Sequence, residues 1–88
     1  MSDKTEHILK RWEKRYGYLG LSKKEYKFFS PVIGKRFTLK FLGKKLYERK
    51  IDNEKRIWVS YGILRDLKVG DIIVFSHDEK NYFVEEKQ

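Results

Sequence analysis

The second half of the chain consists of short apolar runs separated by turn residues, and this pattern restricts the fold most strongly. After a polar stretch at residues 52–55, Ile57 and Val59 share one face of an extended segment while Trp58 lies on the other, which is the two-residue period of a strand. Residues 52–55 include Asp and Asn, whose side chains accept hydrogen bonds from the backbone of a tight turn. The pattern therefore predicts strands joined by short turns.

A second corner is expected at Gly70, within the sequence Lys-Val-Gly-Asp. A tight turn here needs a positive φ, which glycine adopts without steric cost, and the Asp71 carboxylate can accept bonds from nearby amides. The apolar run at residues 72–75 is predicted to be a buried strand. Residues 81–84 are predicted to form its hairpin partner across a connection at residues 76–80.

Another hairpin is predicted just before these elements, with strands at residues 35–41 and 46–51 joined by a turn at residues 43–45. Its exposed side would carry a row of cations: Arg36, Lys40, Lys44, Lys45, Arg49 and Lys50. A two-stranded ribbon of this kind fits the major groove of DNA, where Arg and Lys bind phosphates and guanine edges. Charged residues on an edge strand also prevent sheets from aggregating, which is a structural explanation for the same cations.

The first of two helices is expected at residues 3–15, capped by Asp3 and ended by Gly17. Its apolar residues recur at helical spacing and are expected to pack against the core: Ile8, Leu9, Trp12 and Tyr16. Its cations would cover the remaining surface, either as a solvated face or as contacts to phosphates: Lys10, Arg11, Lys14 and Arg15.

A second helix is expected at residues 22–30, after a linker at residues 16–21. Ser22 and Glu25 have the spacing of a capping box, and Pro31 disfavours the helical conformation in the residue before it. Aromatic residues lie beside lysines in this region, and we expect them in the core. Exposed at the surface, such a row would be a stacking platform for single-stranded nucleic acid.

Positive charge is concentrated in the first part of the chain. Residues 1–50 contain 15 Lys and Arg against 5 Asp and Glu, whereas residues 51–88 contain 6 against 8, and the whole chain carries a net charge of +8. A thermophile-like surface rich in ion pairs would intersperse the two signs. Segregation of the signs instead favours a polyanionic partner, and nucleic acid above all.

Several classes of protein are not expected from this sequence. The chain of 88 residues has the size of one domain, it has no cysteine for disulfides or thiolate metal sites, and it shows neither a spanning apolar run nor a signal peptide. No Gly-rich phosphate loop, zinc spacing or nucleophile motif is present, and His7 is a lone histidine with only His77 elsewhere in the chain. We therefore expect a cytoplasmic protein that is not an enzyme and needs no cofactor or metal.

Four short motifs in the second half resemble the AbrB-like, or swapped-hairpin, family of DNA-binding domains: Arg49-Lys50-Ile51-Asp52, Arg56-Ile57-Trp58-Val59, Ile63-Leu64-Arg65-Asp66-Leu67 and Gly70-Asp71. Lys55 and Ser60 stand where that family has Gly and Pro. The resemblance covers roughly residues 46–86 and implies a homodimer with interleaved hairpins. It also implies DNA contacts by Arg49, Lys50, Arg56 and Arg65. The B-three-type pseudobarrel is the alternative relative, and it implies a monomer.

Together these observations predict an α+β protein with one domain over residues 1–88. A helical segment at residues 1–30 would precede a small twisted β-barrel of about five strands at residues 35–86, with a helical turn at residues 61–67. The predicted function is binding of duplex DNA in a transcriptional or nucleoid role. Two alternatives stay open: an RNA-binding or ribosome-associated barrel, and a protein-interaction module such as an antitoxin or a nuclease inhibitor.

Overall fold

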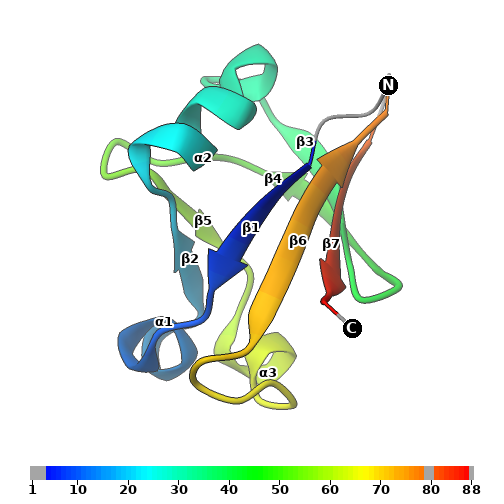
Figure 1. The fold of residues 1–88 in the computed structure, drawn as a ribbon. Coiled ribbons are helices and arrows are strands. Elements are labelled where there is room, and N and C mark those ends of the chain that lie inside the picture. Colours follow the sequence, from blue (N-terminus) through cyan, green and yellow to red (C-terminus); the bar gives the residue numbers. More distant parts are fainter. Residues whose placement is uncertain (1–3, 79–80, 88) are drawn as a thin grey trace.

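The computed structural model describes residues 4–78 and 81–87, and these residues form seven strands and three short α-helices (Figure 1). In chain order the elements are β1 (Lys4–Ile8), α1 (Arg11–Tyr16), β2 (Tyr18–Gly20), α2 (Lys23–Phe28), the 3-10 turn η1 (Ser30–Val32), β3 (Phe37–Phe41), β4 (Lys44–Arg49), β5 (Arg56–Trp58), α3 (Tyr61–Leu64), β6 (Ile72–His77) and β7 (Tyr82–Glu86).

The strands are arranged in two sheets. The larger sheet has the order β1-β6-β7-β3-β4, and the smaller sheet pairs β2 with β5. All pairs are antiparallel except that of β3 with β7, so the larger sheet is mixed. The predicted α+β class is confirmed. The described strands do not form a closed barrel, because β1 and β4 lie at opposite edges of the sheet order.

Alternation along the strands of the larger sheet builds the core. In the parallel pair of β3 and β7, Leu39 lies opposite Tyr82 and Phe41 opposite Val84, and all four side chains are buried. Phe29, which follows α2, is fully buried and stacks on Tyr82 with 4.7 Å between ring centroids. The strand predicted at residues 35–41 is therefore confirmed over Phe37–Phe41, with its apolar side chains buried.

The first predicted helix, at residues 3–15, is wrong over its N-terminal half. This part of the chain forms β1, an edge strand that pairs with β6. Thr5 and His7 point into the protein while the residues between them point to solvent. Because both inward residues are polar, the strand period is hidden from a search for apolar alternation. Asp3, the expected cap, lies outside the described residues.

The remaining helix, α1, is only six residues long. Trp12 is 52% exposed and Tyr16 is 58% exposed, so the prediction that they pack in the core is wrong. Of the four residues in the predicted apolar stripe, only Leu9 is buried. The predicted end at Gly17 is confirmed, because Gly17 has a φ of 82° and its N–H donates to the Glu13 carbonyl over 2.8 Å.

The second predicted helix is confirmed as α2. Its capping box is formed as expected, with Ser22 N–H donating to Glu25 Oε1 over 2.9 Å and Glu25 N–H donating to Ser22 Oγ over 3.3 Å. The helix ends at Phe28, and Pro31 lies in the 3-10 turn that follows. Residues 16–21 are more than the expected linker, because they contain β2.

The predicted turn before β5 is confirmed. Asp52 Oδ1 accepts hydrogen bonds from the N–H groups of Glu54 and Arg56, each over 2.9 Å. Lys55 has a φ of 61°, a conformation that glycine adopts more readily, and it is the position at which AbrB-like domains carry glycine. The turn is thus set largely by the Asp52 side chain.

The second corner and the last hairpin are also confirmed. Gly70 has a φ of 96°, and Asp71 Oδ2 accepts from Lys68 N–H over 2.8 Å. β6 and β7 pair antiparallel as predicted, and α3 forms within the predicted helical segment. Residues 79–80 of the expected connection lie outside the described residues.

The β3–β4 hairpin has its turn one residue earlier than predicted. Leu42 and Gly43 form the turn, with φ of 49° and 86°. Lys44 and Lys45 already belong to β4, where they pair with Phe41 and Lys40. The positive φ at Leu42, an unusual conformation for leucine, could not be read from the residue type.

Candidate nucleic-acid interface

The outer face of the small sheet carries two aromatic rings and a guanidinium group. Its inner residues, Leu19 and Ile57, are fully buried and lie opposite each other, so Tyr18, Trp58 and Arg56 project outward. Tyr18 lies directly opposite Trp58, and their ring centroids are 5.1 Å apart. Arg56 Cζ lies 5.4 Å from the Tyr18 ring centroid and 5.1 Å from that of Trp58, within the range of a cation–π contact.

Hydrogen bonds from the neighbouring turn hold these side chains in place. Asp52 Oδ2 accepts from Arg56 Nε and from Trp58 Nε1, each over 2.9 Å, and Arg56 also pairs with Glu54 over 3.0 Å. Burial opposes ionisation of Asp52, but the hydrogen bonds from Trp58, Arg56 and the Glu54 amide outweigh it and lower the pKa of Asp52. The charge of Arg56 is therefore largely matched, and its main effect is to order the rings.

The aromatic row continues from the small sheet onto α1. The Tyr16 ring centroid lies 6.4 Å from that of Tyr18, and Arg15 Cζ lies 5.7 Å from the Tyr16 ring. On the other side, Arg49 donates from a terminal nitrogen to the Trp58 carbonyl over 3.1 Å. We call the following set the aromatic surface: Tyr16, Tyr18 and Trp58, with Arg15, Arg49 and Arg56 around them.

Further cations lie beside this surface, on α1 and around α3, which share one end of the molecule (Figure 1). Lys14 Nζ donates to the backbone carbonyl of Arg65 over 3.4 Å, so Lys14 reaches from α1 to the residue that follows α3. The cations of this end are Lys10, Arg11, Lys14, Arg15, Arg65 and Lys68. Because Glu13 of α1 is fully buried, it adds no negative charge to the exposed surface of this helix.

The cations predicted on the β3–β4 hairpin separate into two groups. Lys40 and Lys45 are cross-strand partners near the turn, with Lys44 beside them. Arg49 lies at the other end of β4, which has six residues, so it is on the order of 16 Å from Lys44 at about 3.3 Å per residue. Lys50 is exposed next to Arg49. One hairpin therefore does not bring all these cations into one site.

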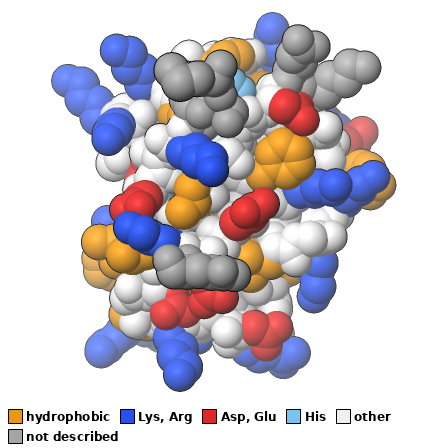
Figure 2. All heavy atoms as spheres, turned by 45° about the vertical axis from the view of Figure 1, so that its right-hand side comes forward, with side chains coloured by type: hydrophobic (Ala, Val, Ile, Leu, Met, Phe, Trp, Pro, Cys, Tyr) orange, Lys and Arg blue, Asp and Glu red, His pale blue; other side chains and the backbone are white. Residues whose placement is uncertain are grey.

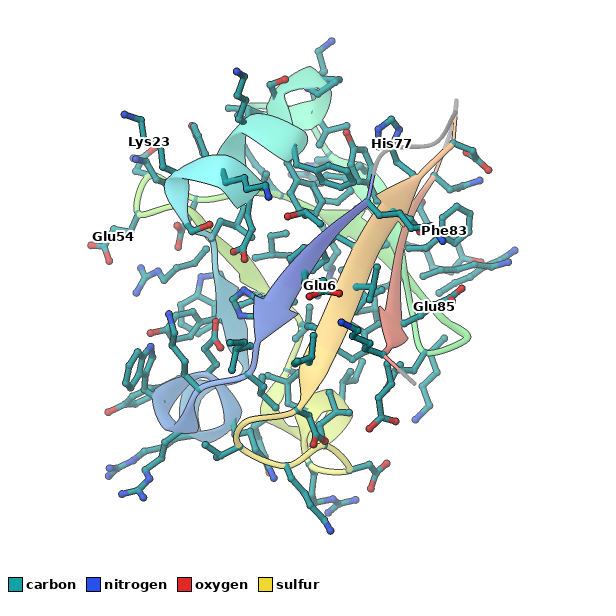
Figure 3. All side chains as sticks on the ribbon, viewed as in Figure 1. Glu6, Lys23, Glu54, His77, Phe83 and Glu85 are labelled. Atoms are coloured by element: carbon teal, nitrogen blue, oxygen red, sulfur yellow. The ribbon has the colours of Figure 1, made fainter. Side chains whose placement is uncertain are left out.

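The group near the turn shares its sheet face with acidic and apolar side chains. Figure 2 shows cations, carboxylates and hydrophobic groups interspersed over the outer side of the large sheet. Glu6, Phe83 and Glu85 project from this side in Figure 3, and Glu6 pairs with Lys87 over 2.7 Å. The cations near the hairpin turn therefore belong to a face of mixed charge.

The structure thus places the eight predicted contact residues in different surroundings. Arg49 and Arg56 meet at Trp58, with Lys50 beside them, and Arg65 lies near α1. Arg36 pairs with Glu48 over 3.2 Å, and both side chains are exposed. The sequence interpretation missed Tyr18 and Trp58 as surface residues. The apolar character of residues 16–21 was the available signal that this stretch is more than a linker.

A buried cluster of three titratable residues lies behind this surface. His7, Glu13 and Glu25 are 3%, 0% and 6% exposed. His7 Nε2 lies 2.8 Å from Glu13 Oε2, and His7 Nδ1 lies 2.9 Å from Glu25 Oε1. Burial by itself lowers the pKa of His7, but the hydrogen bonds and charges of the two carboxylates raise it to about 9. The imidazole is therefore positively charged at neutral pH.

Glu25 responds to the same contacts in the opposite direction. Burial raises its pKa, whereas the bonds from His7 and from Ser22 N–H lower it, and the net effect is a lowered pKa. In the part of the chain that the structure describes, every buried side-chain N and O atom has a hydrogen-bond partner. The cluster is thus a fully satisfied buried ion network, and its residues are held by bonds to one another and to the backbone.

Other kinds of site receive no support from the described residues. No group of three or more His, Cys, Asp or Glu side chains there is arranged to hold a metal ion. No helix within residues 4–78 and 81–87 is long and apolar enough to cross a membrane. A hollow of about 490 Å³ lies between α2 and the β1–β6 pair, with Lys24 and Lys27 among its lining residues.

Comparison with known proteins adds no family assignment. No protein-family model matches this chain, and no curated protein matches it either.

Proposed function

We propose that the protein binds nucleic acid, and duplex DNA in the first place, through the aromatic surface together with the cations of α1 and those that follow α3. The observation that carries this proposal is the position of the exposed rings of Tyr16 and Trp58 beside Arg15 and the other cations of α1, which form no ion pair with a described residue. Lys and Arg side chains bind phosphates and release condensed counterions, which supplies most of the affinity of such proteins. Regulation of transcription or a nucleoid role in the cytoplasm would use this activity.

A second candidate is binding of single-stranded nucleic acid, including RNA. The neighbouring rings of Tyr18 and Trp58 support it, because bases stack on exposed aromatic side chains and each stacked base contributes about 1–3 kcal/mol. Duplex DNA offers no free base faces inside the stack. The two candidates therefore differ in whether the rings contribute to affinity.

The proposed relationship to other DNA-binding domains has two forms. The AbrB-like form implies an interleaved homodimer, and the B-three-like form implies a monomer with a pseudobarrel. In the last hairpin, β6 pairs with β1 and β7, and β7 pairs with β3 and β6. Both strands therefore have two neighbours within one chain, and an interleaved dimer would replace these pairs with equivalent ones from a second chain.

The test is fluorescence anisotropy with short labelled duplex DNA, single-stranded DNA and single-stranded RNA of one sequence at low salt. We expect binding to duplex DNA, with log affinity falling against log salt at a slope near −5 if about six phosphates are neutralised. Stronger binding to single strands, lost in Trp58→Ala, would establish the second candidate. No binding to any of the three probes would refute both and leave a protein-interaction role.

Paired substitutions locate the interface. We expect Arg15→Ala/Arg49→Ala to weaken duplex binding about tenfold or more and to reduce the salt slope by about two. Lys24→Ala/Lys27→Ala is the matched control, since it removes the same charge from the exposed side of α2. Equal losses from the two double variants would mean a diffuse attraction without a defined surface. Circular dichroism checks that each variant is folded.

A further inference from the structure

We propose that His7 and Glu13 are positioning residues for the aromatic surface, and that their buried contact fixes the segment carrying its N-terminal half. The inference rests on the proposed function, because it assigns the internal support of that same site. The segment in question is residues 10–20, which includes α1, Gly17 and β2.

The carboxylate of Glu13 bonds to both ends of this segment. Glu13 Oε1 accepts from Lys10 N–H over 2.8 Å, just before α1, and Glu13 Oε2 accepts from Gly20 N–H over 2.6 Å, at the end of β2. Tyr16 and Tyr18 of the aromatic surface lie between these two anchor points. A single buried side chain thus determines how α1 and β2 are placed relative to each other.

His7 supplies the positive charge that this carboxylate needs. Glu13 is fully buried, and a buried carboxylate without a charged or hydrogen-bonded partner is strongly unfavourable. The groups around His7 are Glu13 from α1, Glu25 from α2 and the Phe75 ring from β6 at 5.6 Å, with the charge of Lys10 acting on Glu25. His7 lies on β1, so the network also connects the segment to the large sheet.

Loss of one proton would remove half of this support. The imidazolium donates from both ring nitrogens, but a neutral imidazole has only one N–H. One of the two buried carboxylates would then face an acceptor nitrogen, and both would lose their charged partner. Since the pKa of His7 is raised to about 9, the folded protein keeps this arrangement at neutral pH and loses it as the pH rises through about 9.

Glu25 provides a matched control inside the same cluster. Like Glu13, it is buried, bonds to His7 and accepts from the backbone at the start of its helix. Unlike Glu13, it has no bond to β2 and lies on α2, away from the aromatic surface. Glu13→Gln and Glu25→Gln therefore make the same chemical change, and only the first reaches the segment with the aromatic residues.

The experiment measures duplex DNA binding and local structure for wild type and both variants at neutral pH. We expect Glu13→Gln to weaken binding about tenfold and to shift the NMR resonances of Gly20 and Lys10, while Glu25→Gln weakens it less than about threefold. Equal losses from the two variants would show a general effect on stability and would overturn the proposal. Should wild type bind no nucleic acid, the proposed function fails, and the Gly20 resonances alone decide the positioning role.

A wild-type pH series covers the case in which a variant does not fold. The carbon-bound proton resonances of the His7 ring and of Gly20 Cα are followed from about pH 6 to pH 10. We expect both to titrate with one midpoint near 9, because the ring proton and the Gly20 bond to Glu13 belong to one network. A His7 midpoint near its ordinary value, or a Gly20 resonance that does not follow it, would overturn the proposal.

Discussion

The buried cluster predicts that the protein loses stability on the alkaline side of neutrality. The pKa of His7 is raised from 6.5 to about 9 in the folded state, and a shift of one unit corresponds to about 1.4 kcal/mol. Below about pH 6.5 His7 is protonated in both the folded and unfolded states, so its full contribution is present. Between about 6.5 and 9 only the unfolded state releases the proton, and the free energy of unfolding falls with each pH unit.

The expected total loss is about 3 kcal/mol by pH 9. This is a large share of the roughly 5–15 kcal/mol that holds a typical domain folded. Urea unfolding monitored by tryptophan fluorescence, at pH values from about 6 to 9, measures it directly. Above about pH 9 the contribution of His7 is exhausted, and any further loss belongs to other groups.

His77→Gln is the control, because His77 is the only other histidine in the chain. This variant should retain the fall in stability between about pH 6.5 and 9. A curve that stays level over this range in wild type would refute the reasoning, since a His7 without a raised pKa cannot be the charged partner of two buried carboxylates. If the fall in stability disappears in His77→Gln, then His77 causes it and the assignment to His7 is wrong.

Three further predictions concern the backbone, the acid limb and the oligomeric state. Gly70→Val should lower the free energy of unfolding by about 1 kcal/mol or more, because φ is 96° at this position. Gly17→Ala should lower it further, because the added Cβ would also collide with the backbone of Ser60 and Tyr61. Thermal unfolding of both variants tests this order, and a larger loss for Gly70→Val would contradict the packing around Gly17. On the acid side, the pKa of Glu25 is lowered in the folded protein, so its contribution to stability is present above the usual glutamate pKa and is lost as the pH falls through the lowered pKa. In urea unfolding, Glu25→Gln should therefore lose less stability than wild type when the pH is lowered. Light scattering at high concentration should give a monomer mass if the pairs of β6 and β7 form within one chain, and a dimer mass would instead support the interleaved AbrB-like form.

The turns of the second half could be predicted because single side chains determine them. Asp52 accepts from two backbone N–H groups of its own turn, and Gly70 adopts a positive φ, so neither needs a distant partner. The strands on either side follow from these corners and from apolar alternation. This explains why the last hairpin and the strand at Ile57 were predicted correctly.

The N-terminal strand could not be predicted from its own residues. β1 exists because β6, more than sixty residues further along the chain, offers it an edge to pair with. Its inward His7 is acceptable in the core only because Glu13 and Glu25 come from two other elements to meet it. Local spacing therefore favoured a helix, and it placed Trp12 in the core although its ring lies at the surface.

The candidate interface was predicted only in part, because pairings between distant strands decide which of its residues lie together. Arg49 and Arg56 were named from the motifs they belong to, and both contact Trp58. Arg49 donates to the Trp58 carbonyl, and the Arg56 guanidinium lies over the Trp58 ring. Lys44 and Lys45 were grouped with Arg49 by their nearness in sequence, but strand geometry separates them. Which side of a strand a residue occupies, and which second sheet covers it, depends on pairings that the residue types do not reveal.

The burial of acidic residues makes the surface more cationic than the sequence count indicates. Residues 1–50 contain five acidic residues, but Glu13 and Glu25 lie inside the protein with the charged His7 between them. Glu48 pairs with Arg36, and Glu6 pairs with Lys87. None of these four carboxylates, which are the acidic residues that the structure describes in this half, forms an ion pair with a cation of α1. The same two buried glutamates that support the N-terminal segment thus leave its exposed side available to a polyanion.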